Sequence, residues 1–423
     1  MVHILLSAGH ETVADLGEAD VILVNTCGFI ESAKTEAIEN ILEACSYKQQ
    51  NPELKVIVTG CLAERYRSQI EEEIPEVDAV VGCASNKAID TIVARLFHGE
   101  NHLESYGAKK DFPLGGKRVI GTPAHYAYLK IAEGCNNRCH YCAIPGIRGP
   151  LHSRDMADCV AEARWLAGEG VKELIVIAQD TTYYGLDLYG RRMLAELLRR
   201  LCRIGGIEWI RLHYAYPTAF PDEVIEVMAR EPKICKYLDI PFQHISDDQL
   251  AAMHRRHTKA QAYELIDKLR QAIPDLALRT TLLVGYPGET EADFEELLEF
   301  VRTVRFERLG VFPYSEEEGT YSARNLPDDV PEEVKQSRVE RVMALQNEIS
   351  LENNRARIGQ LERVIIDSRQ GDFYVGRSQY DSPEVDQEIL IPAAGRRLIR
   401  GCFYQVRITA AEDYDLYGEL ETK

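Results

Sequence analysis

The sequence predicts an α/β chain that ends in a small all-β domain. Buried strand-like runs alternate with helical patterns up to about residue 97, and again from Tyr126 to about residue 354, as in parallel sheets covered by helices. After residue 356 the pattern changes to short alternating strands with Gly turns between them. A chain of 423 residues suits two or three domains, which we expect at 1–105, 121–355 and 356–423.

The N-terminal domain is predicted to be a Rossmann- or flavodoxin-like layer. Its strand-like runs lack polar alternation, which favours a buried parallel sheet: Val21–Cys27, Lys55–Cys61 and Ala79–Gly82. Helical patterns end near Ala8 and cover about 29–50, 63–73 and 85–97. Ligands of such sheets bind at the carboxyl ends of the strands, where Cys27 and Cys61 lie. Residues 99–122 are rich in Gly, Pro and Lys and are expected to be a linker.

The central domain repeats a strand–helix unit six times, which predicts a partial (β/α)6 barrel of the TIM type. The strand-like runs are Tyr126–Ile131, Glu173–Ala178, Trp209–Tyr214, Tyr237–Ile240, Leu278–Val284 and Leu309–Tyr314. Helices are expected near 156–168, 191–204, 221–230, 260–272, 290–304 and 332–354. The C-terminal domain, with runs such as Arg363–Asp367 and Tyr404–Ile408, is predicted to be a small antiparallel barrel.

Composition and charge narrow the function classes. The net charge is −19, and it divides into −8 for residues 1–120, −8 for 121–355 and −3 for 356–423, so no domain carries the basic footprint of a nucleic-acid binder. A basic protein is the more natural partner. No apolar run could span a membrane and the N-terminus does not resemble a signal peptide. Eleven cysteines in such a chain indicate a reducing cytoplasm and metal binding.

The central motif is a cysteine-rich loop that follows the first barrel strand. Cys135, Cys139 and Cys142 are spaced Cys-x3-Cys-x2-Cys, so three thiolates can converge from one loop. Iron–sulfur clusters are bound by such short runs. A structural zinc loop is the alternative, but a zinc site would need a fourth ligand in a matching knuckle, and the neighbouring sequence has none. Three ligands on four irons leave one iron open for a substrate or cofactor.

This spacing, with Tyr141 before the last cysteine, resembles the radical S-adenosylmethionine (SAM) enzymes. The resemblance implies a 4Fe–4S cluster on the three cysteines with SAM bound to its open iron. The run Leu282–Thr290, which ends the fifth strand, is similar to the segment that holds the methionyl part of SAM, and it implies contacts from Gly285, Pro287, Gly288 and Glu289. Gln179 and Arg211, from the second and third strands, are further candidates for the cofactor site. No catalytic residue is expected beyond the clusters.

The whole chain resembles the methylthiotransferase branch of these enzymes, whose parts are an α/β domain with a second 4Fe–4S cluster, the radical SAM barrel and a TRAM domain. Asn25–Gly28 and Thr59–Cys61 match two of the three second-cluster cysteine motifs, which implies that Cys27 and Cys61 are ligands. The family's first strand, with its Gly-Cys-x-Lys-Asn motif and third cysteine, is absent, so we expect a truncated reading of a longer protein and an incomplete second cluster. Cys45 and Cys83 are weaker candidates to replace the third cysteine ligand.

Within this branch, three stretches resemble the members that modify an aspartate in the twelfth protein of the small ribosomal subunit: Tyr314–Thr320, Asp239–His244 and Ser382–Asp386. The resemblance implies that a 5′-deoxyadenosyl radical removes a hydrogen from the aspartate β-carbon and that the second cluster delivers the methylsulfur group. It also implies an electron donor of the flavodoxin or ferredoxin type. The alternatives are a transfer-RNA adenosine methylthiotransferase and an iron–sulfur protein impaired in sulfur transfer.

Overall fold

The structure is a computed structural model that describes residues 1–393 and 395–421. It divides into two compact units, each assembled from several stretches of the chain. Unit 1 comprises Met1–Val119, Glu133–His152 and Ser315–Leu326, and unit 2 comprises Ile120–Ala132, Ser153–Tyr314 and Pro327–Lys423. The units therefore group the chain differently from the three predicted domains, because the cysteine loop belongs to the same unit as the N-terminal α/β layer.

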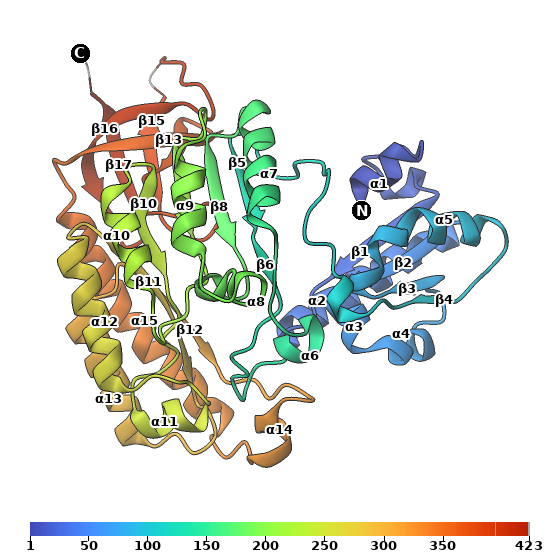
Figure 1. Cartoon of the computed structure of the whole chain (residues 1–423), viewed down its shortest axis with the longest axis horizontal. Coiled ribbons are helices and arrows are strands. Elements are labelled where there is room, and N and C mark those ends of the chain that lie inside the picture. Colours follow the sequence, from blue (N-terminus) through green and yellow to red (C-terminus); the bar gives the residue numbers. More distant parts are fainter. Residues whose placement is uncertain (394, 422–423) are drawn as a thin grey trace. The chain divides into compact units, whose positions relative to one another are not determined.

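Unit 1 is built on a four-stranded parallel sheet in the order β1 (Val21–Thr26), β2 (Lys55–Gly60), β3 (Ala79–Val81) and β4 (Leu103–Ser105), shown in blue in Figure 1. The first three strands confirm the predicted layer. The fourth lies inside the predicted linker. Three residues are too few to show a strand pattern, and β4 forms because its backbone pairs with β3.

Helices cover this sheet where the sequence predicts them, although the helix predicted over about 63–73 is broken at Tyr66. One core cluster packs α2 against the sheet through buried residues such as Ile41, Val56 and Val58. The helices of unit 1 are α1 (Val2–Ser7), α2 (Glu31–Ser46), α3 (Cys61–Arg65), α4 (Arg67–Glu73), α5 (Ile89–Phe97), α6 (Ile144–Arg148) and α14 (Tyr321–Asn325), with 3-10 turns at Leu16–Glu18, Tyr47–Gln49, Cys83–Ala88 and Lys109–Asp111.

Unit 2 contains the predicted strand–helix repeats. Its six strands are all parallel and stand in sequential order, so each strand lies beside the previous one and the sheet is a partial barrel (Figure 1). They are β5 (Tyr126–Lys130), β8 (Glu173–Ile177), β9 (Trp209–Leu212), β10 (Ile234–Asp239), β11 (Ala277–Val284) and β12 (Arg308–Pro313). All six match the predicted runs, because strands buried on both faces are nearly continuous in apolar residues.

The six predicted helices of the repeats are present, and two short helices that were not predicted occur between them. Capping boxes fix the first residues of two of the predicted helices: Thr258 with Gln261, and Thr290 with Asp293. The helices are α7 (Met156–Gly168), α8 (Leu186–Tyr189), α9 (Leu194–Cys202), α10 (Asp222–Arg230), α11 (Asp247–Ala252), α12 (Lys259–Ala272), α13 (Glu291–Val304) and α15 (Glu332–Arg355), of which α8 and α11 were not predicted, and a 3-10 turn lies at Thr181–Tyr183. None of the helices in the described part of the chain is both long and apolar enough to cross a membrane.

The C-terminal part of unit 2 is a closed five-stranded barrel, as predicted, with one parallel strand pair among its antiparallel ones. Its strand order is β13 (Leu361–Gln370), β14 (Phe373–Arg377), β15 (Glu388–Pro392), β17 (Asp415–Leu420) and β16 (Phe403–Ala411). Alternating side chains such as Val364, Ile389 and Val406 fill its interior. Closure removes the exposed strand edges that a sheet of this size would otherwise present.

Candidate functional site

The three loop cysteines lie in unit 1, on a loop entered through the short strand β6 (Ala132–Glu133) and left through β7 (His152–Ser153). Its backbone is tightly folded: the Cys135 N–H donates to Gly149 O at 3.1 Å, and the Cys142 N–H donates to Cys139 O at 3.0 Å. Gly134 has φ +77, and a Cβ there would lie 2.1 Å from Pro150 O, so only glycine fits. The loop thus holds three thiols within one compact turn.

The donor set fits an iron–sulfur cluster better than zinc. The loop supplies three thiols and no fourth cysteine, as expected for a cluster with one open iron. None of the cysteines in the described residues is disulfide-bonded. Among those same residues, no three His, Cys, Asp or Glu side chains already surround a point where a metal ion could bind. Binding a cluster would therefore draw the loop thiols inward, as metal binding commonly does.

Three more cysteines follow the three neighbouring parallel strands of unit 1. Cys27 follows β1 and is exposed, while Cys61 and Cys83 follow β2 and β3 and are buried. The Cys83 thiol donates a hydrogen bond to the Cys61 sulfur, and this bond is the main reason why the pKa of Cys61 falls to about 6, against the opposing effect of burial. The pKa of Cys83 is raised by the same bond. Cys45 lies within helix α2, as the sequence predicts, and not at the end of a strand.

Cys61 also contacts the helix that follows the cysteine loop. Arg148, the last residue of α6, donates from Nη2 to the Cys61 sulfur at 2.9 Å, and Cys61 packs with Ala143 and Ile147 in a small buried cluster. Helix α6 begins two residues after Cys142. The two predicted sets of cluster ligands therefore belong to one packed unit. The spacing of cysteines alone gave no sign of Arg148 or of the Cys61–Cys83 contact.

The acidic stretch Tyr314–Thr320, which follows the sixth strand, makes some of its contacts inside the molecule. Glu317 is 3% exposed and accepts a hydrogen bond from Arg65 at 2.8 Å, with the Lys34 ammonium 3.3 Å away. Just beyond this stretch the Ser322 N–H donates to His140 O in the cysteine loop, and Tyr321 stacks on His140 at 3.8 Å. Residues 315–326 thus connect the α/β layer with the cysteine loop within unit 1.

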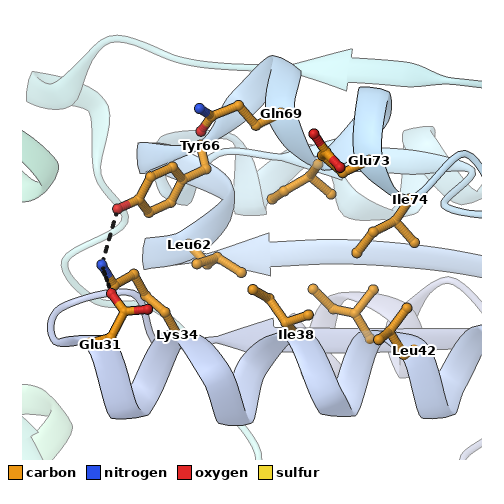
Figure 2. Close-up of a pocket in the computed structure, with 11 residues that line it drawn as sticks. Glu31, Lys34, Ile38, Leu42, Leu62, Tyr66, Gln69, Glu73 and Ile74 are labelled. Atoms are coloured by element: carbon orange, nitrogen blue, oxygen red, sulfur yellow. Dashed lines mark hydrogen bonds and ion pairs between the residues drawn. The ribbon is translucent and has the colours of Figure 1, made fainter. Parts of the chain in front are cut away.

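A mainly apolar groove of unit 1 is lined by none of the predicted cysteines. It encloses about 540 Å³ between α2 and the α3–α4 pair, with Ile38 and Leu42 facing Leu62 and Ile74 (Figure 2). At one end Lys34 contacts Glu31 at 2.5 Å and the Tyr66 hydroxyl at 3.4 Å. Its lining is mainly apolar, so the groove is chemically distinct from the thiol-rich strand ends.

In unit 2 the predicted SAM segment forms a tight turn between β11 and α13. Gly285 has φ +72 and a Cβ there would lie 2.3 Å from Lys335 Cγ, so a side chain would clash. The Glu289 carboxylate is buried, accepts a hydrogen bond from the Gly285 N–H, and contacts Arg338 at 2.9 Å and His244 at 3.1 Å. The Gly288 N–H donates to Asp329 at 2.8 Å. Glu289 therefore holds the turn together from within.

Arg211 lies elsewhere in unit 2. Its guanidinium is fully buried, donates to Glu173 at 2.8 Å, and reaches the carbonyl oxygens of Gln379 and Ser378 in the C-terminal barrel. Glu173 begins β8, so Arg211 points toward the amino end of the strands. Gln179 follows the carboxyl end of β8, as predicted, and Tyr141 is half-buried in the cysteine loop of unit 1. The predicted SAM contacts are therefore divided between the two units, and within unit 2 Arg211 lies apart from the others.

The stretch Ser382–Asp386 joins the small barrel to the sheet of unit 2. Ser382 shares a 2.9 Å hydrogen bond with His213, Glu384 accepts from the Tyr126 hydroxyl at 2.8 Å, and Asp386 lies 3.4 Å from Arg279. Burial lowers the pKa of His213 to about 3, with further lowering by Arg211 and Arg279, so the ring is neutral near pH 7. Three of the five residues of this stretch thus make polar contacts inside unit 2.

Comparison with known families accounts for most of the chain. Residues 129–301 match the radical SAM superfamily, residues 358–420 match the TRAM domain, and residues 1–82 match the uncharacterized protein family UPF0004. The radical SAM superfamily uses a 4Fe–4S cluster and SAM, which agrees with the donor set of the cysteine loop.

Relatives with established names extend over nearly the whole chain. It is 50% identical to the ribosomal protein uS12 methylthiotransferase RimO of Christiangramia forsetii, over 98% of this chain and 89% of that protein. It is 51% identical to RimO of Flavobacterium johnsoniae, over 97% and 90%. Among solved structures, the radical SAM methyltransferase TsrM of Kitasatospora setae shares the fold with a TM-score of 0.53 at 14% identity, over 70% of this chain and 65% of that one.

Proposed function

Because this chain belongs to the RimO family of ribosomal protein uS12 methylthiotransferases, we propose that it transfers a methylthio group to ribosomal protein uS12. The observation that carries the proposal is the 50% identity to RimO over 98% of the chain. The target atom is the β-carbon of an aspartate. Action on a ribosomal protein would place the enzyme in the cytoplasm.

The first part of the proposal concerns the loop thiols of unit 1. Cys135, Cys139 and Cys142 bind a 4Fe–4S cluster, supported by their spacing and by the tight backbone of the loop. With SAM, this cluster supplies the radical chemistry that an unactivated C–H bond requires. The protein contributes the thiol ligands, the fixed loop and the orientation of SAM. Electrons come from a donor of the flavodoxin or ferredoxin type.

The second part concerns the turn Gly285–Glu289 in unit 2. We propose that the backbone of Gly285, Pro287 and Gly288 lies against SAM, where the absence of bulky side chains permits close approach. Glu289 is a positioning residue, since its carboxylate is occupied by Gly285, Arg338 and His244. Tyr141 and Gln179 remain proposed SAM contacts. Arg211 has less support as a SAM contact, because its guanidinium already binds Glu173 and the small barrel.

The third part concerns sulfur delivery. We propose that Cys27 and Cys61 are two of the three cysteine ligands of the second 4Fe–4S cluster, supported by their places after the neighbouring parallel strands β1 and β2. The low pKa of Cys61 favours the thiolate that iron requires. Cys83 follows the next strand, β3, and shares a hydrogen bond with Cys61, so it stays a weaker candidate to replace the third ligand.

The net negative charge supports a protein substrate. The C-terminal domain carries 9 basic and 12 acidic residues, for a net charge of −3, which suits a basic ribosomal protein better than RNA. The test is a pair of reactions under the same reducing conditions, one with uS12 and one with transfer RNA. Methylthio groups on uS12 alone are the expected result. Methylthio groups on transfer RNA with unmodified uS12 would refute the proposal.

A further inference from the structure

Arg148 contacts the sulfur of Cys61, a proposed ligand of the second cluster. It ends α6, the helix that follows the cysteine loop, yet its Nη2 donates to the sulfur of Cys61 on α3, at 2.9 Å. Cys61 is 8% exposed. A guanidinium so close to a buried sulfur is a charge-assisted donor in a region of low dielectric, where such a bond is strong.

The guanidinium of Arg148 is held in this position by other groups of unit 1. Its Nη1 lies 3.5 Å from the carboxylate of Glu133, which is 2% exposed and begins the cysteine loop. Its central carbon lies 5.7 Å from the ring centre of Phe112. Ala143 and Ile147 of the same helix pack on Cys61. The Arg148–Cys61 bond is therefore anchored by an ion pair, a ring and an apolar contact.

Hydrogen bonds to ligand sulfurs and nearby charge are two of the means by which a protein sets the reduction potential of an iron–sulfur cluster. We infer that Arg148 is a positioning residue of the second cluster: it holds the Cys61 sulfur in place and raises the cluster's reduction potential. The reason for the direction is that reduction adds negative charge, which the guanidinium stabilises. The inference rests on the proposed role of Cys61 as a ligand.

The test isolates the second site in the full-length chain. The triple variant Cys135→Ala, Cys139→Ala, Cys142→Ala removes the loop thiols, so the iron that remains reports on the second site. In this background, Arg148→Gln, Arg148→Lys and the control Arg95→Gln are reconstituted anaerobically. Arg95 is a suitable control because it pairs with Glu100 on the exposed surface of the same unit. Iron and sulfide per chain, circular dichroism and the midpoint potential from an EPR-monitored titration are measured.

Arg148→Gln is expected to lower the equilibrium constant for reduction about tenfold, which is about 59 mV for one electron. Arg148→Lys keeps the charge but not the planar donor geometry and should give an intermediate value, while Arg95→Gln should leave the potential unchanged. If circular dichroism shows that Arg148→Gln does not fold, the midpoint potential of Arg148→Lys decides whether the inference holds. Full iron content at an unchanged potential in the folded Arg148 variants would overturn the inference. Absence of iron from the triple variant itself would contradict the second cluster, and so the proposed function, before Arg148 is altered.

Discussion

The guanidinium of Arg211 donates to the carboxylate of Glu173 at 2.8 Å, and both side chains are completely buried. Arg377 of the small barrel approaches the other oxygen of Glu173 at 2.5 Å. Burial alone would raise the pKa of Glu173, but Arg377 and Arg211 hold it below its ordinary value. One carboxylate on the first residue of β8 thus joins two arginines where the sheet of unit 2 meets the small barrel.

Arg211→Met should destabilise unit 2 by about 3–5 kcal/mol, because it leaves buried Glu173 with one fewer partner. The matched control is Arg363→Met, which removes a partly exposed ion pair with Glu208 and should cost less than about 1 kcal/mol. Urea denaturation followed by tryptophan fluorescence reports on unit 2, since both Trp165 and Trp209 lie in it and Trp209 is 4.7 Å from Phe403. Equal effects of the two variants would contradict the importance of the buried pair.

His213 should make the protein less stable as the pH falls below about 6.5, the ordinary pKa of an exposed imidazole. Its pKa is lowered from 6.5 to about 3 by folding, so between these pH values the unfolded chain binds the additional proton. Stability is then lost on acidification at up to about 1.4 kcal/mol per pH unit. His213→Gln should remove this contribution, measured as a shallower decline of the unfolding free energy between about pH 6 and 4. An unchanged slope would mean that the ring is protonated when folded.

Glu317→Gln should loosen the segment 315–326, because the substitution removes the charge that pairs with Arg65 and Lys34. Hydrogen exchange of amides in this segment should become faster, consistent with a loss of about 3 kcal/mol for a broken buried pair. Glu316→Gln is the control, since Glu316 is the exposed neighbour. Faster exchange in both variants would show that the run of acidic residues acts by its total charge.

Glu289→Gln should weaken SAM binding about tenfold or more, because the turn loses a carboxylate that contacts Gly285, Arg338 and His244. The measurement is the dissociation constant of SAM by equilibrium dialysis with the reconstituted protein. Glu291→Gln serves as the control, since this exposed residue contacts Arg338 and Arg341 outside the turn. Unaltered affinity for SAM in Glu289→Gln would remove the turn from the cofactor site.

Much of the fold could be predicted because the strands of its parallel sheets are largely buried and several of its helices carry side-chain caps, as α12 and α13 do. β4 could not, since three residues that pair only with β3 leave no pattern. The cysteine spacing predicted the donors of the site but not their neighbours. Arg211 was expected at SAM because it lies on a barrel strand, yet a strand pattern cannot say toward which end a long side chain turns. Arg148 was missed, and the contacts of Glu317 were not predicted, because their partners are distant in sequence.

The two sets of cysteines are expected to have different tasks in the reaction, and the mass of uS12 after reaction tests this most directly. With SAM and a reductant, the wild-type enzyme should replace one hydrogen of a single aspartate in uS12 by a methylthio group. Cys61→Ala should still form 5′-deoxyadenosine but leave the mass of uS12 unchanged, whereas Cys139→Ala should form no 5′-deoxyadenosine and also leave that mass unchanged. The buried helix residue Cys159 should tolerate alanine. A methylthio group on uS12 after reaction with Cys61→Ala would contradict this division of tasks.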